Sequence, residues 1–203
     1  MKATKRTRIP VAAGERGRLK ALAGLVSIAL LLVPFGAAAC GHERWAVKTG
    51  TDRDAGKIHL QPVIRTTVAK LDALRAPAHL PARRRIRPVE THVYRVRATL
   101  IEYKRERDDD YHLVLRGRSG QTMIAEIPAP HCVGSASPLA AGIARARREF
   151  NAHYHVTDSF HHVHRRVEVA GVGFFDFHHG QTGVAPNAIE LHPVLDVRFA
   201  GSG

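Results

Sequence analysis

The chain has 203 residues, of which 44% are hydrophobic, so it is long enough to form one folded domain with a sizeable core. It has only two cysteines, which are too few for a zinc ribbon with its four ligands. The chain has 31 Lys and Arg and 18 Asp and Glu, and seven of the basic residues and one of the acidic residues lie at positions 1–39. The rest of the chain therefore has 24 basic and 17 acidic residues and a net charge of +7. This charge is compatible with an anionic polymer or lipid as partner, but it does not predict nucleic-acid binding.

Residues 1–39 have the pattern of an export signal. A basic segment is followed by the apolar run ALAGLVSIALLLVPFGAAA at 21–39, which ends in small residues. The run is interrupted at Pro34 and is shorter than the roughly 20 residues that a bilayer span needs. We predict that residues 1–39 are removed and that the protein is exported across the bacterial inner membrane into the periplasm or cell envelope.

The first residue after this signal is Cys40, within the sequence AAAC. AAAC resembles the lipobox of bacterial lipoproteins, and this resemblance implies lipidation of Cys40 and a lipid anchor in the membrane. Ala37 stands where the lipobox usually has leucine, and the same residues fit an ordinary signal-peptidase site. In that alternative Cys40 keeps its thiol and can form a disulfide with Cys132.

Residues 40–91 are predicted to form an N-terminal extension rather than part of the core. They contain four prolines and few periodic apolar residues. One short helix is predicted there, because Ile64, Val68, Leu71 and Leu74 fall on one helical stripe.

Residues 92–200 are predicted to form a mainly β domain. In the segment 93–103, Tyr94, Val96, Ala98 and Leu100 alternate with the polar residues Arg95, Arg97 and Thr99, as in a half-buried strand. Further strands are predicted at 111–115, 122–127, 167–177 and 188–197, with a helix from Ser137 to Phe150 between the third and fourth. The resulting order, β-β-β-α-β-β, is that of a five-stranded OB-fold-like barrel of the α+β class.

Three residues of the last two strands favour a small, sharply bent sheet. Gly171 and Gly173 in the fourth strand are typical of a bend or bulge. Pro193 in the fifth strand fits an edge or bulge position.

In an OB-fold, the connections 104–110 and 178–187 flank the ligand-binding face. The polar residues that we predict on this face are Asp108, Asp109, His178, His179 and Gln181.

Two pairs of acidic and histidine side chains are candidate metal ligands. Asp110 and His112 are two residues apart on one strand, as are Glu190 and His192, so each pair shares a face. Carboxylates and imidazoles from neighbouring strands are the ligands of divalent metal sites, and such a metal is the only cofactor that the sequence indicates. The alternative is that these residues form the solvated outer face of an antiparallel sheet.

Five histidines lie between residues 153 and 164. We predict a flexible connection in this region, where such a tract binds metal loosely or not at all.

The segments ERWAVKTGTD, DDDYHLVL, MIAEIP and GVGFFDFHHGQTGVAPNAIELHPVLDV resemble those of a group of uncharacterised exported bacterial proteins. The likeness covers most of the chain after the signal and is strongest in a C-terminal segment of the type GVGFFDFxHGQTGVAPNxIELHPVLDV. It implies an exported bacterial protein and brings no established activity.

The leading interpretation is a lipid-anchored, monomeric cell-envelope protein with an OB-like domain that binds an anionic polymer or another envelope ligand. It is not expected to be an enzyme, and no catalytic residue is predicted. One alternative is a metal-dependent phosphodiesterase or nuclease-like hydrolase that uses Asp110, His112, Glu190 and His192. The other is a structural envelope protein without a soluble ligand.

Overall fold

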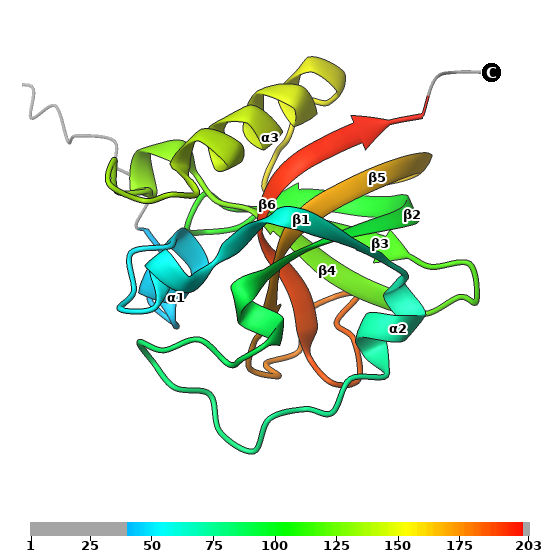
Figure 1. Ribbon diagram of the computed structural model, residues 1–203. Helices are drawn as coiled ribbons and strands as arrows, with labels where there is room; N and C mark the ends of the chain where they lie inside the picture. Colours follow the sequence, from blue (N-terminus) through cyan, green and yellow to red (C-terminus); the bar gives the residue numbers. More distant parts are fainter. Residues whose placement is uncertain (1–39, 201–203) are drawn as a thin grey trace, which may run out of the picture. The chain divides into compact units, whose positions relative to one another are not determined.

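The computed structural model describes residues 40–200 (Figure 1). The predicted export signal, residues 1–39, lies outside these residues. The strands are β1 (His59–Thr66), β2 (His92–Arg105), β3 (Tyr111–Arg116), β4 (Thr122–Ile127), β5 (His161–Phe175) and β6 (Ile189–Phe199). The α-helices are α1 (Trp45–Thr49), α2 (Val68–Asp72) and α3 (Ala140–His153), and the 3-10 helices are η1 (Ala55–Lys57), η2 (Val89–Thr91) and η3 (Pro130–Cys132).

The strands form one mixed sheet in the order β1-β2-β3-β4-β6-β5. Because β2 also pairs with β5, backbone hydrogen bonds run in a ring through five strands, from β2 through β3, β4, β6 and β5 back to β2. The pairs β1–β2 and β4–β6 are parallel, and the others are antiparallel. The prediction of a mainly β, α+β fold is confirmed.

The predicted alternation in β2 is confirmed. Tyr94, Val96 and Leu100 are buried in the main hydrophobic core, while Arg97 on the other face is exposed. β3 differs from the prediction because it is buried on both faces, from Tyr111 to Leu115. The second face of β3 is therefore covered by another part of the chain.

The number of strands differs from the five predicted. The sequence places residues 59–66 in an extension and Ile64 in a helix. These residues instead form β1, which pairs in parallel with β2. The helix α2 begins only at Val68, because the hydroxyl of Thr67 accepts a hydrogen bond from the Lys70 amide at 3.2 Å and caps it. The prediction of a helix is right for Val68 and Leu71 and wrong for Ile64 and Leu74, which lie before and after α2.

A buried ion pair attaches the N-terminal segment to the sheet. The guanidinium of Arg44 donates to both carboxylate oxygens of Glu90, at 2.7 and 2.8 Å, and to the carbonyl oxygen of Phe175 at 2.7 Å. Glu90 also accepts hydrogen bonds from the backbone amides of Ile86 and Phe175. Because every charged atom in this group has partners, burial of the pair is compatible with a stable fold.

The bulge predicted near Gly171 and Pro193 is confirmed. The register of β5 and β6 shifts on either side of Gly171, whose partner is Val194, so that Pro193 has no opposite residue. A Cβ atom on Gly171 would lie 2.8 Å from the Pro193 carbonyl oxygen, a contact that only glycine avoids.

The helix α3 packs against β6 (Figure 1). Ile143, Ala146 and Phe150 are buried, as their spacing predicts. Ser137 precedes the helix, and its hydroxyl accepts a hydrogen bond from the Leu139 amide at 3.1 Å. Within residues 40–200, no helix is long and apolar enough to cross a membrane.

Candidate functional site

The two loops predicted at the ligand face lie beside one pocket of about 540 Å³. We call this the loop pocket. It is lined by Cys40, Gly41, His42, Glu43, Lys48, Lys104, Glu106, Arg107, Asp108, Glu126, Asp176, His179, Gly180 and Gln181. Three of the predicted ligand-face residues, Asp108, His179 and Gln181, are therefore in the pocket wall.

The other two predicted ligand-face residues do not line the pocket. Asp109 has a left-handed backbone, with φ of 67°, and its carboxylate pairs with Arg147 of α3 at 3.3 Å. His178 is exposed. Asp109 therefore links the β2–β3 loop to α3 rather than facing a ligand.

Five polar side chains form a buried cluster next to the loop pocket, which we call the carboxylate–histidine cluster. Its members are Asp110, His112, Glu126, Glu190 and His192. The sequence predicts four of them, and Glu126 is the addition. Their side chains are 0% to 1% exposed, except for Glu126 at 13%. The alternative of a solvated outer sheet face is therefore wrong.

The sheet register explains why these side chains meet. His112 of β3 is directly opposite Glu126 of β4. In the parallel pair β4–β6, Ala125 is opposite Leu191, so the next step along both strands places Glu126 beside His192. Residues opposite each other on adjacent strands share a face, and the three side chains form one row.

The β5–β6 loop covers this row and removes it from solvent. The Nε2 atom of His112 donates a hydrogen bond to the carbonyl oxygen of Thr182 at 2.9 Å. Gly183, with φ of 83°, packs so closely on β3 that a Cβ atom there would lie 2.4 Å from a methyl group of Val114. Only glycine fits both this backbone conformation and this close approach.

His192 lies at the centre of the cluster. Its Nε2 is 3.5 Å from Oδ2 of Asp110, and its Nδ1 is 3.0 Å from Oε2 of Glu126 and 3.7 Å from Oε2 of Glu190. Both ring nitrogens, Oδ2 of Asp110 and Oε2 of Glu190 have no well-oriented hydrogen-bond partner within residues 40–200. Buried polar atoms without partners lower stability, so this group of atoms has unused capacity for a ligand.

The electrostatics of the cluster reflect its burial. Burial raises the pKa of Asp110, and it raises the pKa of Glu190 to about 7. For His192, burial alone would lower the pKa, but the surrounding carboxylates raise it well above its usual value. Burial would raise the pKa of the Glu126 carboxyl, but His112 and His192 lower it well below its usual value. His192 is therefore held as a cation between the carboxylates, and a metal ion that binds there has to displace the imidazole proton.

Lys48 of α1 connects the cluster to the loop pocket. Its Nζ atom is 3.0 Å from Oδ2 of Asp176, and the lysine lines the pocket together with Glu126. Burial would lower the pKa of Lys48, but Glu126, Asp176 and Glu190 raise it above its usual value. Lys48 is therefore a fixed positive charge between buried carboxylates and the pocket.

Within residues 40–200, two groups have side chains close enough to hold a metal without including the disulfide-bonded Cys40 and Cys132. Asp110, Glu126 and His192 offer ligand atoms within 4.8 Å of one another. Zinc lies about 2.0 to 2.2 Å from its nitrogen and oxygen ligands, so these ligand atoms are about 3 to 4 Å from one another. The ligand atoms of Asp110, Glu126 and His192 therefore need to approach one another only slightly to bind zinc. Glu43, Asp176 and His179 form the second group, but Asp176 is already paired with Lys48 and the other two are exposed.

The histidine-rich segment differs from the prediction. His153 ends α3, and β5 begins at His161, so the last three histidines lie on a strand rather than in a connection. His161 stacks on Tyr103, and Nδ1 of His162 lies 3.2 Å from the Glu102 carboxylate. No candidate metal group in the described part of the chain includes these histidines.

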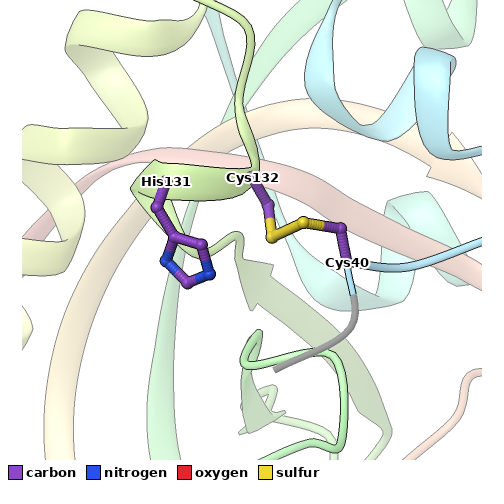
Figure 2. A group of neighbouring side chains, drawn as sticks. All are labelled: Cys40, His131 and Cys132. Carbon is purple, nitrogen blue, oxygen red and sulfur yellow. A yellow bond between two sulfur atoms is a disulfide. The ribbon is translucent and has the colours of Figure 1, made fainter. Parts of the chain in front are cut away.

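Cys40 and Cys132 form a disulfide, with their Cα atoms 5.6 Å apart (Figure 2). This bond corresponds to the alternative in which Cys40 keeps its thiol. A sulfur atom cannot carry both a thioether-linked lipid and a disulfide, so this bond and the predicted lipid anchor on Cys40 are alternative forms of the residue. The pairing also removes both sulfurs from a metal site with His131, the third side chain in Figure 2.

The sequence reasoning missed three residues near the pocket, Lys48, Glu126 and Asp176. The signal for Glu126 is a single acidic residue in the otherwise apolar strand TMIAEI, where a buried charge needs partners. Comparison with known proteins gives no match to any family model and none to any curated protein. No residue role is therefore carried over from a relative.

Proposed function

We propose that the protein is an exported cell-envelope domain of the OB type that binds a ligand in the loop pocket, above a divalent cation held by Asp110, Glu126 and His192. The ring order β2-β3-β4-β6-β5 supports the OB assignment, as does the position of α3 between β4 and β5 along the chain. The position of the loop pocket between the β2–β3 and β5–β6 loops supports the choice of binding face.

One observation carries this proposal. His192 is fully buried among three carboxylates, and neither of its ring nitrogens has a well-oriented hydrogen-bond partner within residues 40–200. Carboxylate oxygens and an imidazole that has released its proton are the ligands that zinc and manganese bind in proteins. Glu126 belongs both to this group and to the pocket wall, so a cation there would be within reach of a pocket ligand.

Isothermal titration calorimetry of chelator-treated protein with zinc or manganese tests this proposal. The parent protein is expected to bind one equivalent, and His192→Ala and Glu126→Gln are expected to weaken binding by at least about 100-fold, because each variant loses a direct ligand. His162→Ala is the matched control, since His162 is exposed and lies outside the candidate group. Equal binding by the parent and His192→Ala would remove the proposal.

A second candidate is a metal-dependent phosphodiesterase or nuclease-like hydrolase. The position of Lys48 favours it, because a buried cation beside the candidate metal could stabilise negative charge on a phosphodiester. Incubation with nucleic acid and manganese, with and without chelator, separates the two functions. Chelator-sensitive cleavage that is lost in Asp110→Ala would favour the hydrolase. Metal binding without cleavage would favour the binding domain, and neither activity would favour a structural envelope protein.

The proposed export has a separate test. Disulfides persist in oxidising compartments outside the cytoplasm, and the Cys40–Cys132 bond is compatible with such a location. The mass of the mature protein isolated from bacterial cells is expected to equal that of residues 40–203 minus two hydrogen atoms. A mass that includes residues 1–39 would refute cleavage of the signal, and an added diacylglyceryl group would identify the lipoprotein form instead.

A further inference from the structure

A second binding site is indicated at the other ends of β3 and β6, away from the carboxylate–histidine cluster. Thr99 of β2 is directly opposite Arg116 of β3 on one side and Arg166 of β5 on the other. Residues opposite each other share a face of the sheet, so the three side chains form a row. We call this the Arg116–Thr99–Arg166 row. Adjacent strands are about 4.8 Å apart, so the two arginines are held about 10 Å apart across the threonine.

The neighbouring row on the same face already contains an acid. Two residues along β2, Arg97 is opposite Glu168, which in turn is opposite Arg198 of β6. The side chain of Arg97 donates a hydrogen bond to Glu168, which neutralises part of the charge. On β5, the Arg116–Thr99–Arg166 row has Arg166 where this row has Glu168.

The arginines of the Arg116–Thr99–Arg166 row are not neutralised by the described part of the chain. Neither Arg116 nor Arg166 forms an ion pair with a carboxylate of residues 40–200, whereas Glu168 pairs with Arg97 and lies 3.6 Å from Arg95. Each of the two arginines is directly opposite Thr99 rather than an acid, so neither charge is balanced by its neighbour in the sheet. An external anion between Arg116 and Arg166 would be attracted by both guanidinium groups.

The row lines a hollow with space for such an anion. The hollow has a volume of about 480 Å³, and its arginines are Arg97, Arg116, Arg118, Arg166 and Arg198. A second hollow of about 590 Å³ shares Arg97, Gly117 and Arg118 with the first and adds Arg65 and Arg95. Glu168 is the only acid among the described residues that line either hollow, and no lysine is among them.

The use of arginine alone indicates the chemistry of the ligand. A guanidinium presents planar pairs of N–H donors that match two oxygens of a phosphate, which the single ammonium of lysine does not. The hydroxyl of Thr99, between Arg116 and Arg166, adds a further donor. The continuation of arginines into the adjoining hollow suits a ligand with several phosphate groups rather than one.

We propose that the Arg116–Thr99–Arg166 row binds a phosphate group of a polyphosphorylated ligand, whose further phosphates contact the arginines of the adjoining hollow. This site is separate from the loop pocket, since neither hollow shares a lining residue with that pocket. It is also separate from the carboxylate–histidine cluster, because Asp110, just before β3, and Arg116, at its end, are six residues apart, or about 20 Å at the rise of a strand. The two sources of such a ligand are a soluble phosphate chain and the clustered headgroups of an anionic lipid surface.

Calorimetric titration with inorganic tripolyphosphate, in chelator and at low salt, tests the site independently of any metal. Arg166→Gln and Arg116→Gln are each expected to weaken binding about tenfold, through the loss of one charge-assisted contact. Arg148→Gln is the matched control, because it removes the same charge from an exposed position on α3 that lines neither hollow. Circular dichroism confirms that each variant is folded.

Equal weakening in Arg148→Gln and Arg166→Gln would overturn the proposal, because net charge alone would then explain binding. A parallel titration with vesicles of phosphatidylglycerol, against phosphatidylcholine as control, separates the two sources. If Arg116→Gln and Arg166→Gln weaken the binding of tripolyphosphate but not of phosphatidylglycerol vesicles, the ligand is a soluble phosphate chain. If these variants weaken the binding of phosphatidylglycerol vesicles, the ligand is a lipid surface. Binding of neither by the parent protein would also overturn the proposal.

Discussion

Removal of the Cys40–Cys132 disulfide is expected to lower the stability of the protein substantially. The bond joins residues 92 positions apart, so it closes a long loop in the unfolded chain. The chain-entropy relation gives about 4 to 5 kcal/mol for a loop of this size at 25 °C. This is a large share of the roughly 5 to 15 kcal/mol that holds a typical domain folded.

Guanidinium unfolding of the oxidised parent and of Cys132→Ser, monitored by tryptophan fluorescence, measures this difference. Cys40→Ser is the matched variant and is expected to lose the same amount, because either change opens the same loop. Metal binding is expected to persist in both, since Glu126 and His192 are on β4 and β6 and Asp110 directly precedes β3. A loss below about 1 kcal/mol would refute the loop-closure reasoning, as would two free thiols in the oxidised parent.

Two further substitutions test buried charges. Glu90→Gln is expected to lower the free energy of unfolding in urea by about 3 to 5 kcal/mol, because it leaves the guanidinium of Arg44 buried without its paired charge. A loss similar to that of the control Glu149→Gln, whose side chain is 45% exposed, would contradict this. In chelator, Glu190→Gln is expected to be more stabilising at pH 8 than at pH 5, by about 2 to 3 kcal/mol. Burial raises the pKa of Glu190 from its usual 4.5 to about 7 in the folded protein. Below pH 4.5 the buried carboxyl is neutral and the parent keeps its full stability. The parent loses that stability as the pH rises through 7, because the buried carboxyl becomes charged. Urea titrations at both pH values measure the difference, and a pH-independent effect of the substitution would exclude the raised pKa.

Much of the sheet is predictable from the sequence because its strands follow the period of two. β2 and β4 lie where alternation or a short apolar run places them, and the bulge beside Pro193 follows from the missing amide of proline. β1 is not predictable in this way, because it is an edge strand with Leu60 and Ile64 exposed and Pro62 within it. The apolar spacing that indicates a helix there arises from two elements joined at Thr67.

The candidate site was predictable only in part. The i, i+2 spacing correctly groups Asp110 with His112 and Glu190 with His192, because it depends on strand geometry alone. Their burial depends on the β5–β6 loop, whose path over β3 is a long-range feature. Glu126 is brought to His192 by the parallel pairing of β4 with β6, which no local pattern specifies.

The most direct test of the central claim is to locate the cation in crystals of the protein grown with manganese or zinc. Anomalous difference maps at the metal edge are expected to show one strong peak bounded by Asp110, Glu126 and His192. The same crystals of His192→Ala, grown in the same way, are expected to lack it. A peak only at the exposed histidines of β5, or only at Glu43, Asp176 and His179, would contradict the proposed metal site.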